Sequence, residues 1–261
     1  MVSVRTSTLA IGDVHGCGEE LAELLARCDR WYPDGRLVFV GDLFTKGPTP
    51  GLVAKLIRER RDRGQRIDLI CGNHDLRLRD ALRRRQQGAH LDSLPDTEAQ
   101  TLKLLEKSNT LREAGDLTLE ACGRVQLRDP RGRWTVVHAG IDPALGLAAT
   151  PDYVKVHIKA LEGTPHWWER YDGRDGLIVV GHKPLPEALI KRDAGGEPFV
   201  AVLDTGCAYG GALTAYCLED DRLVQTPSAQ PPSNGFTGPP VALLASEPRS
   251  AWGALARTIA R

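Results

Sequence analysis

The chain has 261 residues, in which 34 Lys and Arg balance 34 Asp and Glu, so its formal net charge is zero. This balance excludes a global positive field of the kind that draws a protein to nucleic acid or acidic membranes. Hydrophobic residues make up 41% and aromatic residues only 5%, which predicts a globular protein with an aliphatic core. No run approaches the roughly 18 apolar residues of a membrane span, and residues 1–6 carry no secretory signal, so we expect a cytoplasmic protein without a membrane partner.

Short apolar runs alternate with helical patterns through the first part of the chain. The apolar runs predict strands at 8–11, 37–40 and 67–71, and apolar residues at helical spacing predict helices over 21–28 and 52–57. These strands are apolar on both faces, which is typical of strands covered on each side. The alternation therefore predicts an α/β fold with a covered, largely parallel sheet.

Residues 76–120 interrupt this alternation, because they are helical in composition, and we expect a helical insertion over one face of the sheet. Strands are predicted to resume at 134–137, 177–180, 199–203 and 212–218. The last of these enters a hairpin at 219–221, and the chain beyond it is rich in Pro, Gly and Ser. We therefore predict one domain over residues 1–225 and a C-terminal extension over 226–261, with a short helix after residue 240.

Polar side chains with metal-binding atoms stand where five of the predicted strands end. They are, in chain order, Asp13, His15, Asp42, Asn73, His74, His138 and His182. Ligands of open α/β sheets gather outside the carboxyl ends of the strands. Burial of so many polar groups without partners would cost several kcal/mol. The pattern therefore predicts a metal centre.

Two divalent cations suit this set better than one, because each ion takes about five or six oxygen and nitrogen ligands, waters included. One ion would take Asp13, His15 and Asp42, and the other would take Asp42, Asn73, His138 and His182, with Asp42 as the bridge. Two such ions about 3.5–4 Å apart acidify a water and hold both oxygens of an in-line phosphoryl displacement. We expect Mn²⁺, with Fe, Zn, Co and Mg as alternatives.

Five short motifs carry these residues. They read Gly12-Asp13-Val14-His15-Gly16, Gly41-Asp42-Leu43-Phe44-Thr45-Lys46-Gly47, Gly72-Asn73-His74-Asp75, His138-Ala139-Gly140 and Gly181-His182. In this order they resemble the successive motifs of the PPP-type, calcineurin-like metallophosphatases. The later run Asp204-Thr205-Gly206-Cys207-Ala208-Tyr209-Gly210-Gly211 is similar to the diadenosine tetraphosphatase branch, and Lys46 resembles the subgroup of ApaH-like phosphatases.

This resemblance implies a calcineurin-like metallophosphatase fold, in which two mixed β-sheets pack face to face and are flanked by helices. It implies a dimetal hydrolase that uses a metal-held hydroxide, with His74 as the general acid for the leaving oxygen. Asp75, next to His74, is a second catalytic candidate. Protein phosphatases of the superfamily usually place an aspartate at the position of Thr45 and an arginine at that of Cys71. Both residues are missing here, which disfavours a phosphoprotein substrate.

Two basic side chains are candidate phosphate-binding residues. Lys46 follows Asp42 in a glycine-flanked loop, where it would meet a phosphate as a point charge or remain a surface charge. Arg77 opens a run of arginines directly after the predicted catalytic loop, and phosphate contact and a solvated helix face both stay open for it. The pair Trp167-Trp168 is suited to stacking on a nucleobase or to packing in the core, and we favour packing.

The leading functional hypothesis is therefore a dimetal phosphohydrolase that cleaves phosphoanhydride bonds. Its substrate would be a phosphorylated small molecule, such as a dinucleoside tetraphosphate or a nucleoside 5′-polyphosphate, or else polyphosphate, with nucleic acid entering only as a 5′-end substrate. The alternative is a Ser/Thr phosphoprotein phosphatase, and a third hypothesis is a binding module that has lost catalysis. The complete set of candidate metal ligands speaks against the third hypothesis. The sequence assigns no oligomeric state.

Overall fold

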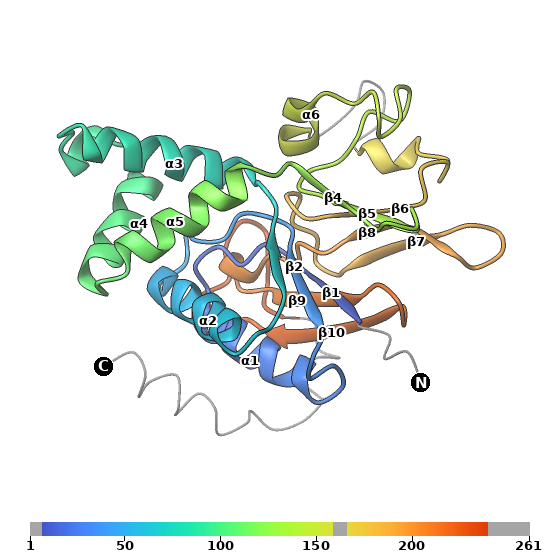
Figure 1. Ribbon diagram of the computed structural model, residues 1–261, viewed down its shortest axis with the longest axis horizontal. Coiled ribbons are helices and arrows are strands. Elements are labelled where there is room, and N and C mark those ends of the chain that lie inside the picture. The colour runs from blue at the N-terminus through green and yellow to red at the C-terminus, as the bar shows by residue number, and fades with distance from the viewer. Residues whose placement is uncertain (1–6, 159–165, 240–261) are drawn as a thin grey trace.

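The computed structural model describes residues 7–158 and 166–239, and its centre is a pair of β-sheets packed face to face (Figure 1). The strands of the first sheet are β1 (Thr8–Ile11), β2 (Arg36–Phe39), β3 (Ile67–Leu69), β9 (Ala212–Cys217) and β10 (Arg222–Pro227). Their order is β10-β9-β1-β2-β3, in which β1, β2 and β3 are parallel, β9 is antiparallel to β1, and β10 is antiparallel to β9.

The second sheet repeats this mixed arrangement. Its strands are β4 (Gln126–Arg128), β5 (Trp134–Val137), β6 (Leu177–Val180), β7 (Leu189–Arg192) and β8 (Pro198–Val202). The order is β4-β5-β6-β8-β7, with β5, β6 and β8 parallel and an antiparallel strand at each edge. The expectation of one largely parallel sheet is therefore wrong, whereas the two mixed sheets that the family resemblance implied are confirmed.

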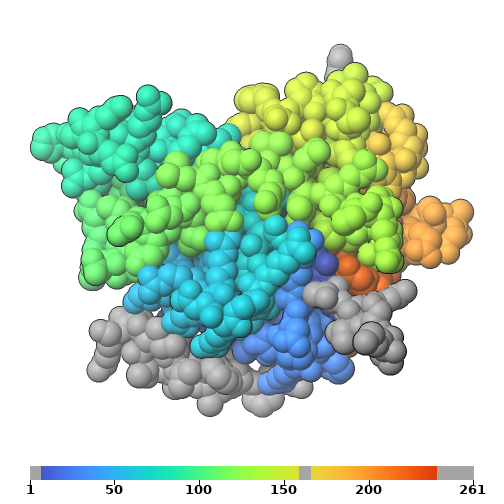
Figure 2. All heavy atoms as spheres, viewed as in Figure 1, coloured from blue at the N-terminus to red at the C-terminus, as the bar shows by residue number. Residues whose placement is uncertain are grey.

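Helices cover the outer faces of this pair of sheets. They are α1 (Gly18–Asp29), α2 (Pro50–Asp62), α3 (Asn73–Gln86), α4 (Asp96–Lys107), α5 (Leu111–Cys122) and α6 (Asp152–His157), with 3-10 turns η1 (Leu91–Ser93), η2 (Trp167–Glu169) and η3 (Cys207–Tyr209). In α1, Leu21, Leu24, Leu25 and Cys28 are buried, as their helical spacing predicts. Helices α3 to α5 occupy the predicted insertion and form a lobe, which a notch separates from the region around α6 (Figures 1 and 2).

Three apolar layers hold the domain together. The middle layer fills the space between the sheets with small aliphatic side chains, among them Ala10, Val38, Val136 and Val179. A second layer packs α1, α2 and the helical lobe on the first sheet, and a third covers the second sheet. Trp167 belongs to this third layer, is fully buried and donates its indole hydrogen to the Ala139 carbonyl (3.0 Å). The tryptophan pair therefore packs in the core.

The strands that carry no apolar run are edge strands. Strands β4 and β7 have no fully buried side chain. Neither shows the regular alternation of apolar and polar residues from which a strand could be predicted. Strand β10 completes the expected hairpin and runs to Pro227, two residues past the boundary expected at 225. Ser228 and the residues after it then pack on the domain. The helix expected after residue 240 lies outside the described residues.

Candidate active site and metal centre

The predicted metal ligands lie together at one edge of the two packed sheets. Asp13, Asp42 and Asn73 follow the carboxyl ends of the parallel strands β1, β2 and β3, and His138 and His182 follow β5 and β6. The loops meet because the parallel strands of both sheets point to this edge. The residues that follow the strand ends therefore form a single cluster of oxygen and nitrogen atoms.

Asp42 lies at the centre of the cluster. Its Oδ2 is 3.5 Å from Nε2 of His15, and its Oδ1 is 3.6 Å from Nε2 of His138. Oδ1 also accepts a hydrogen bond from the backbone N–H of His74 (2.9 Å). One carboxylate therefore faces imidazoles on both sides, as a bridging ligand must.

The second half of the cluster brings three ligand atoms to one point. Oδ1 of Asn73 lies 3.1 Å from Nε2 of His138 and 2.8 Å from Nδ1 of His182, and those two nitrogens are 3.2 Å apart. Nδ1 of His138 is 2.9 Å from the Val40 carbonyl, so it must carry the ring hydrogen. Nε2 of His138 then directs a lone pair at the amide oxygen of Asn73. Two acceptors in this arrangement repel each other until a cation lies between them.

On the other side of Asp42, the amino group of Lys46 lies next to the candidate ligand His15. Nζ of Lys46 lies 2.6 Å from Nε2 of His15, while the hydroxyl of Thr45 is 3.3 Å from Nδ1 of the same ring. An ammonium group beside a ligand nitrogen is a stand-in for a metal ion. This contact, together with the facing acceptors and the purely oxygen and nitrogen donor set, shows that the residues fit divalent metal.

Asp13 links the two sheets across this edge. Its two carboxylate oxygens accept the backbone N–H of His182 at 3.2 and 3.1 Å, and Oδ2 lies 3.9 Å from Nε2 of His15. The carboxylate lies so close to Gly181 that any Cβ there would collide with it. Glycine at this position therefore lets the two metal loops approach each other.

Left-handed backbone conformations concentrate in these loops. Across residues 7–158 and 166–239, seven residues other than glycine have positive φ, and four of them belong to the loops that carry the candidate metal ligands. These four are His15 (φ 49°), Asp42 (φ 54°), Lys46 (φ 77°) and His182 (φ 69°). Such residues cost about 1–3 kcal/mol each and persist where the surroundings hold them in place. The backbone is therefore strained at the positions that aim the ligands.

Burial raises the pKa values of the carboxyl groups in the cluster and lowers those of the imidazoles. It raises the pKa of Asp42 and that of Asp204 to about 6, and burial together with the charge of Asp204 raises the pKa of Asp13. Burial also lowers the pKa of His138 to about 3 and lowers the pKa of His15. Without metal, burial therefore shifts both kinds of side chain toward their neutral forms. A divalent cation would stabilise the carboxylates and would bind the neutral imidazoles.

The two catalytic candidates have different surroundings. His74 borders the active-site cavity, and its Nδ1 is a buried atom that has no hydrogen-bond partner among the described residues. Burial lowers its pKa to about 3, so its ring is neutral in the metal-free protein. The Asp75 carboxylate instead accepts backbone N–H groups of Asp42 (2.8 Å), Leu43 (3.1 Å) and Gly72 (2.9 Å). Asp75 thus links the loop after β2, which carries Asp42, to the loop after β3, which carries Asn73.

A cavity of about 270 Å³ opens from the metal ligands. Its walls are made by Asp42, Lys46, Asn73, His74, His182, Lys183, Pro184, Tyr209 and Asn234. The predicted phosphate residue Lys46 is therefore part of the wall, with Nζ 5.1 Å from the ring centre of Tyr209. Arg77 is not among the lining residues. Its side chain is 58% exposed and lies 3.9 Å from the buried carboxylate of Glu98.

Sequence reasoning missed three residues of the site. Asp204 lies two residues after the end of strand β8 and is buried beside Asp13, so the strand-end rule that selected the other candidate ligands could have selected it as well. Tyr209 and Asn234 line the cavity. The run that contains Tyr209 was used only to support the family resemblance. Asn234 lies in a Pro/Ser-rich stretch without a motif or hydrophobic periodicity.

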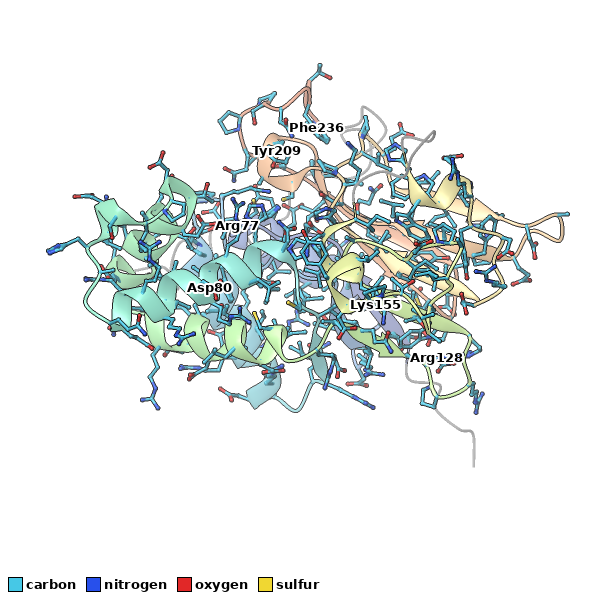
Figure 3. All side chains as sticks on the ribbon, turned by 90° about the horizontal axis from the view of Figure 1, so that it is seen from above. Arg77, Asp80, Arg128, Lys155, Tyr209 and Phe236 are labelled. Atoms are coloured by element: carbon cyan, nitrogen blue, oxygen red, sulfur yellow. The ribbon has the colours of Figure 1, made fainter. Side chains whose placement is uncertain are left out.

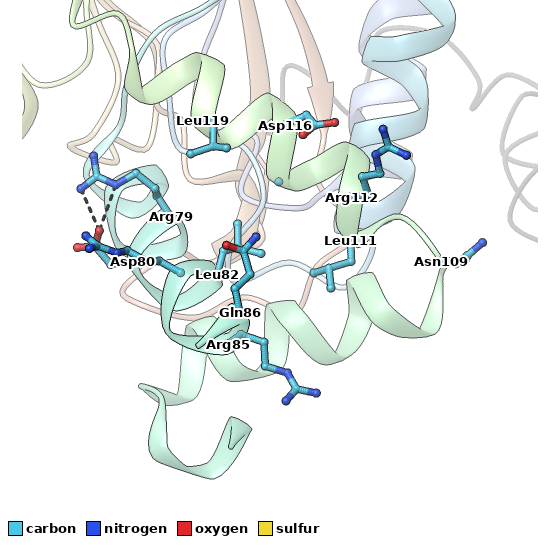
Figure 4. Close-up of a pocket in the computed structure, with 12 residues that line it drawn as sticks. Arg79, Asp80, Leu82, Arg85, Gln86, Asn109, Leu111, Arg112, Asp116 and Leu119 are labelled. Atoms are coloured by element: carbon cyan, nitrogen blue, oxygen red, sulfur yellow. Dashed lines mark hydrogen bonds and ion pairs between the residues drawn. The ribbon is translucent and has the colours of Figure 1, made fainter. Parts of the chain in front are cut away.

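A larger cavity of about 660 Å³ lies between α3 and α5 and is distinct from the metal loops (Figure 4). Leucines such as Leu82 and Leu111 form its floor, and arginines of the predicted run, Arg79, Arg83 and Arg85, surround it. These arginines therefore serve the helical lobe. No helix of the described residues is long and apolar enough to cross a bilayer.

Two facing mixed sheets with a buried oxygen and nitrogen ligand cluster at their common edge define a metal-dependent hydrolase. The chain matches the model of the calcineurin-like phosphoesterases over residues 6–228 and belongs to that family. It is 30% identical to an asymmetrical bis(5′-nucleosyl)-tetraphosphatase of Halalkalibacterium halodurans, over 85% of this chain and 94% of that one.

Other relatives agree with this assignment. The chain is 26% identical to a symmetrical bis(5′-nucleosyl)-tetraphosphatase of a Janthinobacterium species, over 86% of this chain and 97% of that one. Among solved structures, a protein provisionally described as a diadenosine tetraphosphatase shares the fold with a TM-score of 0.65 and 22% identity, over 90% and 97% of the two chains. The calcineurin-like fold and the class of metal-dependent hydrolase are therefore confirmed.

Proposed function

We propose that this protein hydrolyses phosphoanhydride bonds of dinucleoside polyphosphates with the help of two divalent cations, Mn²⁺ being the first choice. The observation that carries the proposal is the cavity itself, because the candidate metal ligands Asp42, Asn73 and His182 line it together with Lys46, Lys183 and Tyr209. A chain of phosphates needs cations past the reacting phosphorus, and a nucleoside needs a flat apolar contact. The names of the relatives support this substrate class.

In this proposal the cations are held by the residues that the sequence predicted. Asp13, His15 and Asp42 would hold one, and Asp42, Asn73, His138 and His182 would hold the other. Bound there, the two ions would supply an acidified water and would offset the charge of the transferring phosphoryl group. Asp204 adds a further negative charge next to Asp13.

The remaining roles belong to side chains of the cavity wall. His74 protonates the leaving oxygen, because its ring borders the cavity and the charge of a polyphosphate raises the pKa of a neighbouring imidazole. Asp75 is a positioning residue that fixes the loops of Asp42 and Asn73 through its three backbone hydrogen bonds. Lys46 binds a phosphate that follows the scissile bond.

The structure gives a phosphoprotein substrate less support. Cys71 is buried and its thiol donates to the Gly72 carbonyl, and Thr45 is buried against His15. Neither side chain supplies the cation or the carboxylate that the protein phosphatases use at these positions. The polyphosphate reading is therefore the one that we test.

The test compares substrates on one preparation of the Mn²⁺-loaded protein. We expect kcat/KM for diadenosine tetraphosphate to exceed that for a phosphoserine peptide by at least roughly a hundredfold, because the peptide has one phosphate and makes no use of the distal cations. Removal of metal with a chelator should abolish both activities. A phosphopeptide hydrolysed faster than any anhydride would overturn the proposal.

A further inference from the structure

The segment after strand β10 returns to the active-site wall and is held there. We call residues 228–239 the C-terminal strap. The buried carboxylate oxygen Oε1 of Glu20 accepts hydrogen bonds from the backbone N–H of Ala229 (3.0 Å) and from Nε2 of Gln230 (2.9 Å). The hydroxyl of Ser228 donates to the Cys207 carbonyl (2.7 Å). These bonds fix the start of the strap beside the turn η3.

The second half of the strap packs on Tyr209 of the cavity wall. The rings of Phe236 and Tyr209 are stacked with centroids 6.0 Å apart at 23°, and the backbone N–H of Ser233 donates to the Tyr209 carbonyl (3.1 Å). Figure 3 shows the two rings at the same end of the molecule. A Cβ on Gly206 or Gly211 would run into the Phe236 ring, so these glycines make room for the strap.

This packing places Asn234 in the wall of the active-site cavity. Asn234 lines the cavity together with Tyr209, Lys183 and Pro184, and the candidate metal ligands Asp42, Asn73 and His182 line the same cavity. The family match ends at residue 228, so all but the first residue of the strap lies beyond the part of the chain that the family model describes. The contact that Asn234 offers therefore lies outside the part of the chain on which the family assignment rests.

We propose that Asn234 and the stacked pair Tyr209 and Phe236 form a nucleoside-binding subsite, which selects nucleotides over bare polyphosphate. A carboxamide both donates and accepts hydrogen bonds, as the edges of nucleobases and ribose hydroxyls require. An aromatic side chain gives a flat surface for a base. The nearby Lys46 and Lys183 meet the attached phosphates. This inference rests on the proposed function for its substrate class.

The test measures binding, so that it needs no turnover. α,β-Methylene-ADP and methylenediphosphonate differ by the nucleoside, and in both a methylene replaces the anhydride oxygen. We expect calorimetry on the Mn²⁺-loaded protein to show at least tenfold tighter binding of the nucleotide. Asn234→Ala should weaken nucleotide binding about tenfold, with methylenediphosphonate affinity changed less than twofold. Phe236→Ala, which releases the strap from Tyr209, should act in the same direction.

A matched control separates the side chain from its backbone. Asn109 is also an exposed asparagine with left-handed backbone, at φ 55° against 51° for Asn234, and it does not line the active-site cavity. Asn109→Ala should leave both affinities unchanged. Equal nucleotide losses in the two variants would overturn the subsite, as would equal losses on both ligands or equal wild-type affinities. If the wild type prefers the nucleotide but hydrolyses no anhydride, the proposed function fails and the subsite stands.

Discussion

The two cavities of this protein differ in the residues that line them, and the smaller one contains the candidate metal ligands. The cavity between α3 and α5 is about 660 Å³ and is lined by leucines and by arginines such as Arg79, which pairs with Asp80 (Figure 4). The cavity at the metal loops is about 270 Å³ and collects Asp42, Asn73 and His74. Catalytic groups need convergent polar atoms in strained, well-supported loops more than they need volume.

The first prediction removes the bridging carboxylate. Asp42→Asn should lower kcat by roughly a thousandfold or more, because an amide cannot give negative charge to two cations. The measurement pairs kcat with metal content per chain, which should fall below two. Asp116→Asn, in the wall of the larger cavity, is the matched control and should keep both values. A variant of Asp42 with wild-type turnover and two bound metals would disprove the bridging role.

The second prediction separates acid catalysis from metal binding. His74→Asn should keep both metals and lose about 10²–10⁴ in rate on alkyl phosphates, whose leaving groups need a proton. The loss should be far smaller on p-nitrophenyl phosphate, whose leaving group departs as an anion. Rates on a series of leaving groups of rising pKa measure this difference. An equal loss along the series would assign His74 to the metal site.

The clustering of the candidate metal ligands could be predicted from the sequence because one rule covers them all. Each stands within four residues of the end of an apolar run, and the carboxyl ends of parallel strands meet at one edge whichever sheet the strands belong to. The central strands β1, β5 and β6 could be predicted for the same reason, since each is a continuous buried run. The rule holds even though the apolar pattern predicted one largely parallel sheet and the structure has two mixed sheets.

Features that depend on packing between distant segments could not be predicted. Strand β7 has a half-buried, partly charged face, and its pairing with β8 exists only because the edge of the sheet is available. The three backbone bonds of Asp75 join loops far apart in the chain. Asn234 reaches the cavity only through the Glu20 and Phe236 anchors of the strap. None of these leaves a local pattern.

The third prediction uses pH to weaken the metal centre. The raised pKa of Asp42, about 6, means that the metal-free fold loses stability as pH rises from about 4 to 6, since the unfolded chain releases that proton first. The raised pKa of Asp13 acts in the same direction. Bound metal removes that cost, because it stabilises the ionised carboxylates. The rise in Tm on adding Mn²⁺ should therefore be full above pH 7 and should be lost as pH falls through about 6.

Histidine protonation does not produce the same trend. The lowered pKa of His138, about 3, keeps its ring neutral at pH 5, and burial lowers the pKa of His15 in the same direction, so protons compete little with metal at these nitrogens. Their neutral burial costs stability as pH falls below 6.5 with or without metal, so the difference in Tm isolates the carboxylates. Thermal melts at pH 5 and 7.5, with Asp42→Asn as the control, measure it. A Tm rise of the same size at both pH values would contradict the prediction.

The fourth prediction concerns Lys46, which lines the cavity and contacts His15 at 2.6 Å. Metal bound at His15 would repel the ammonium and leave it for a phosphate of the substrate. Lys46→Ala should lower kcat/KM for diadenosine tetraphosphate about tenfold, as expected for one charge-assisted contact, and should lower it less for p-nitrophenyl phosphate. Lys183→Ala, one residue from a ligand, is a useful comparison. Parallel losses on both substrates would assign Lys46 to the metal site or the fold.

The smallest effect is expected for Arg77, which lies on α3 but lines neither cavity. It begins the arginine run of α3, yet its side chain is 58% exposed, pairs with Glu98 at 3.9 Å and lines neither the metal cavity nor the larger one. Exposed charges are screened by solvent, so Arg77→Ala should lower kcat/KM for diadenosine tetraphosphate about two- to threefold and that for p-nitrophenyl phosphate not at all. The loss should vanish at high salt, whereas Arg83→Ala, in the larger cavity, should change neither substrate at any salt concentration. A tenfold, salt-resistant loss in Arg77→Ala would mean that α3 turns its first arginine into the cavity when substrate binds.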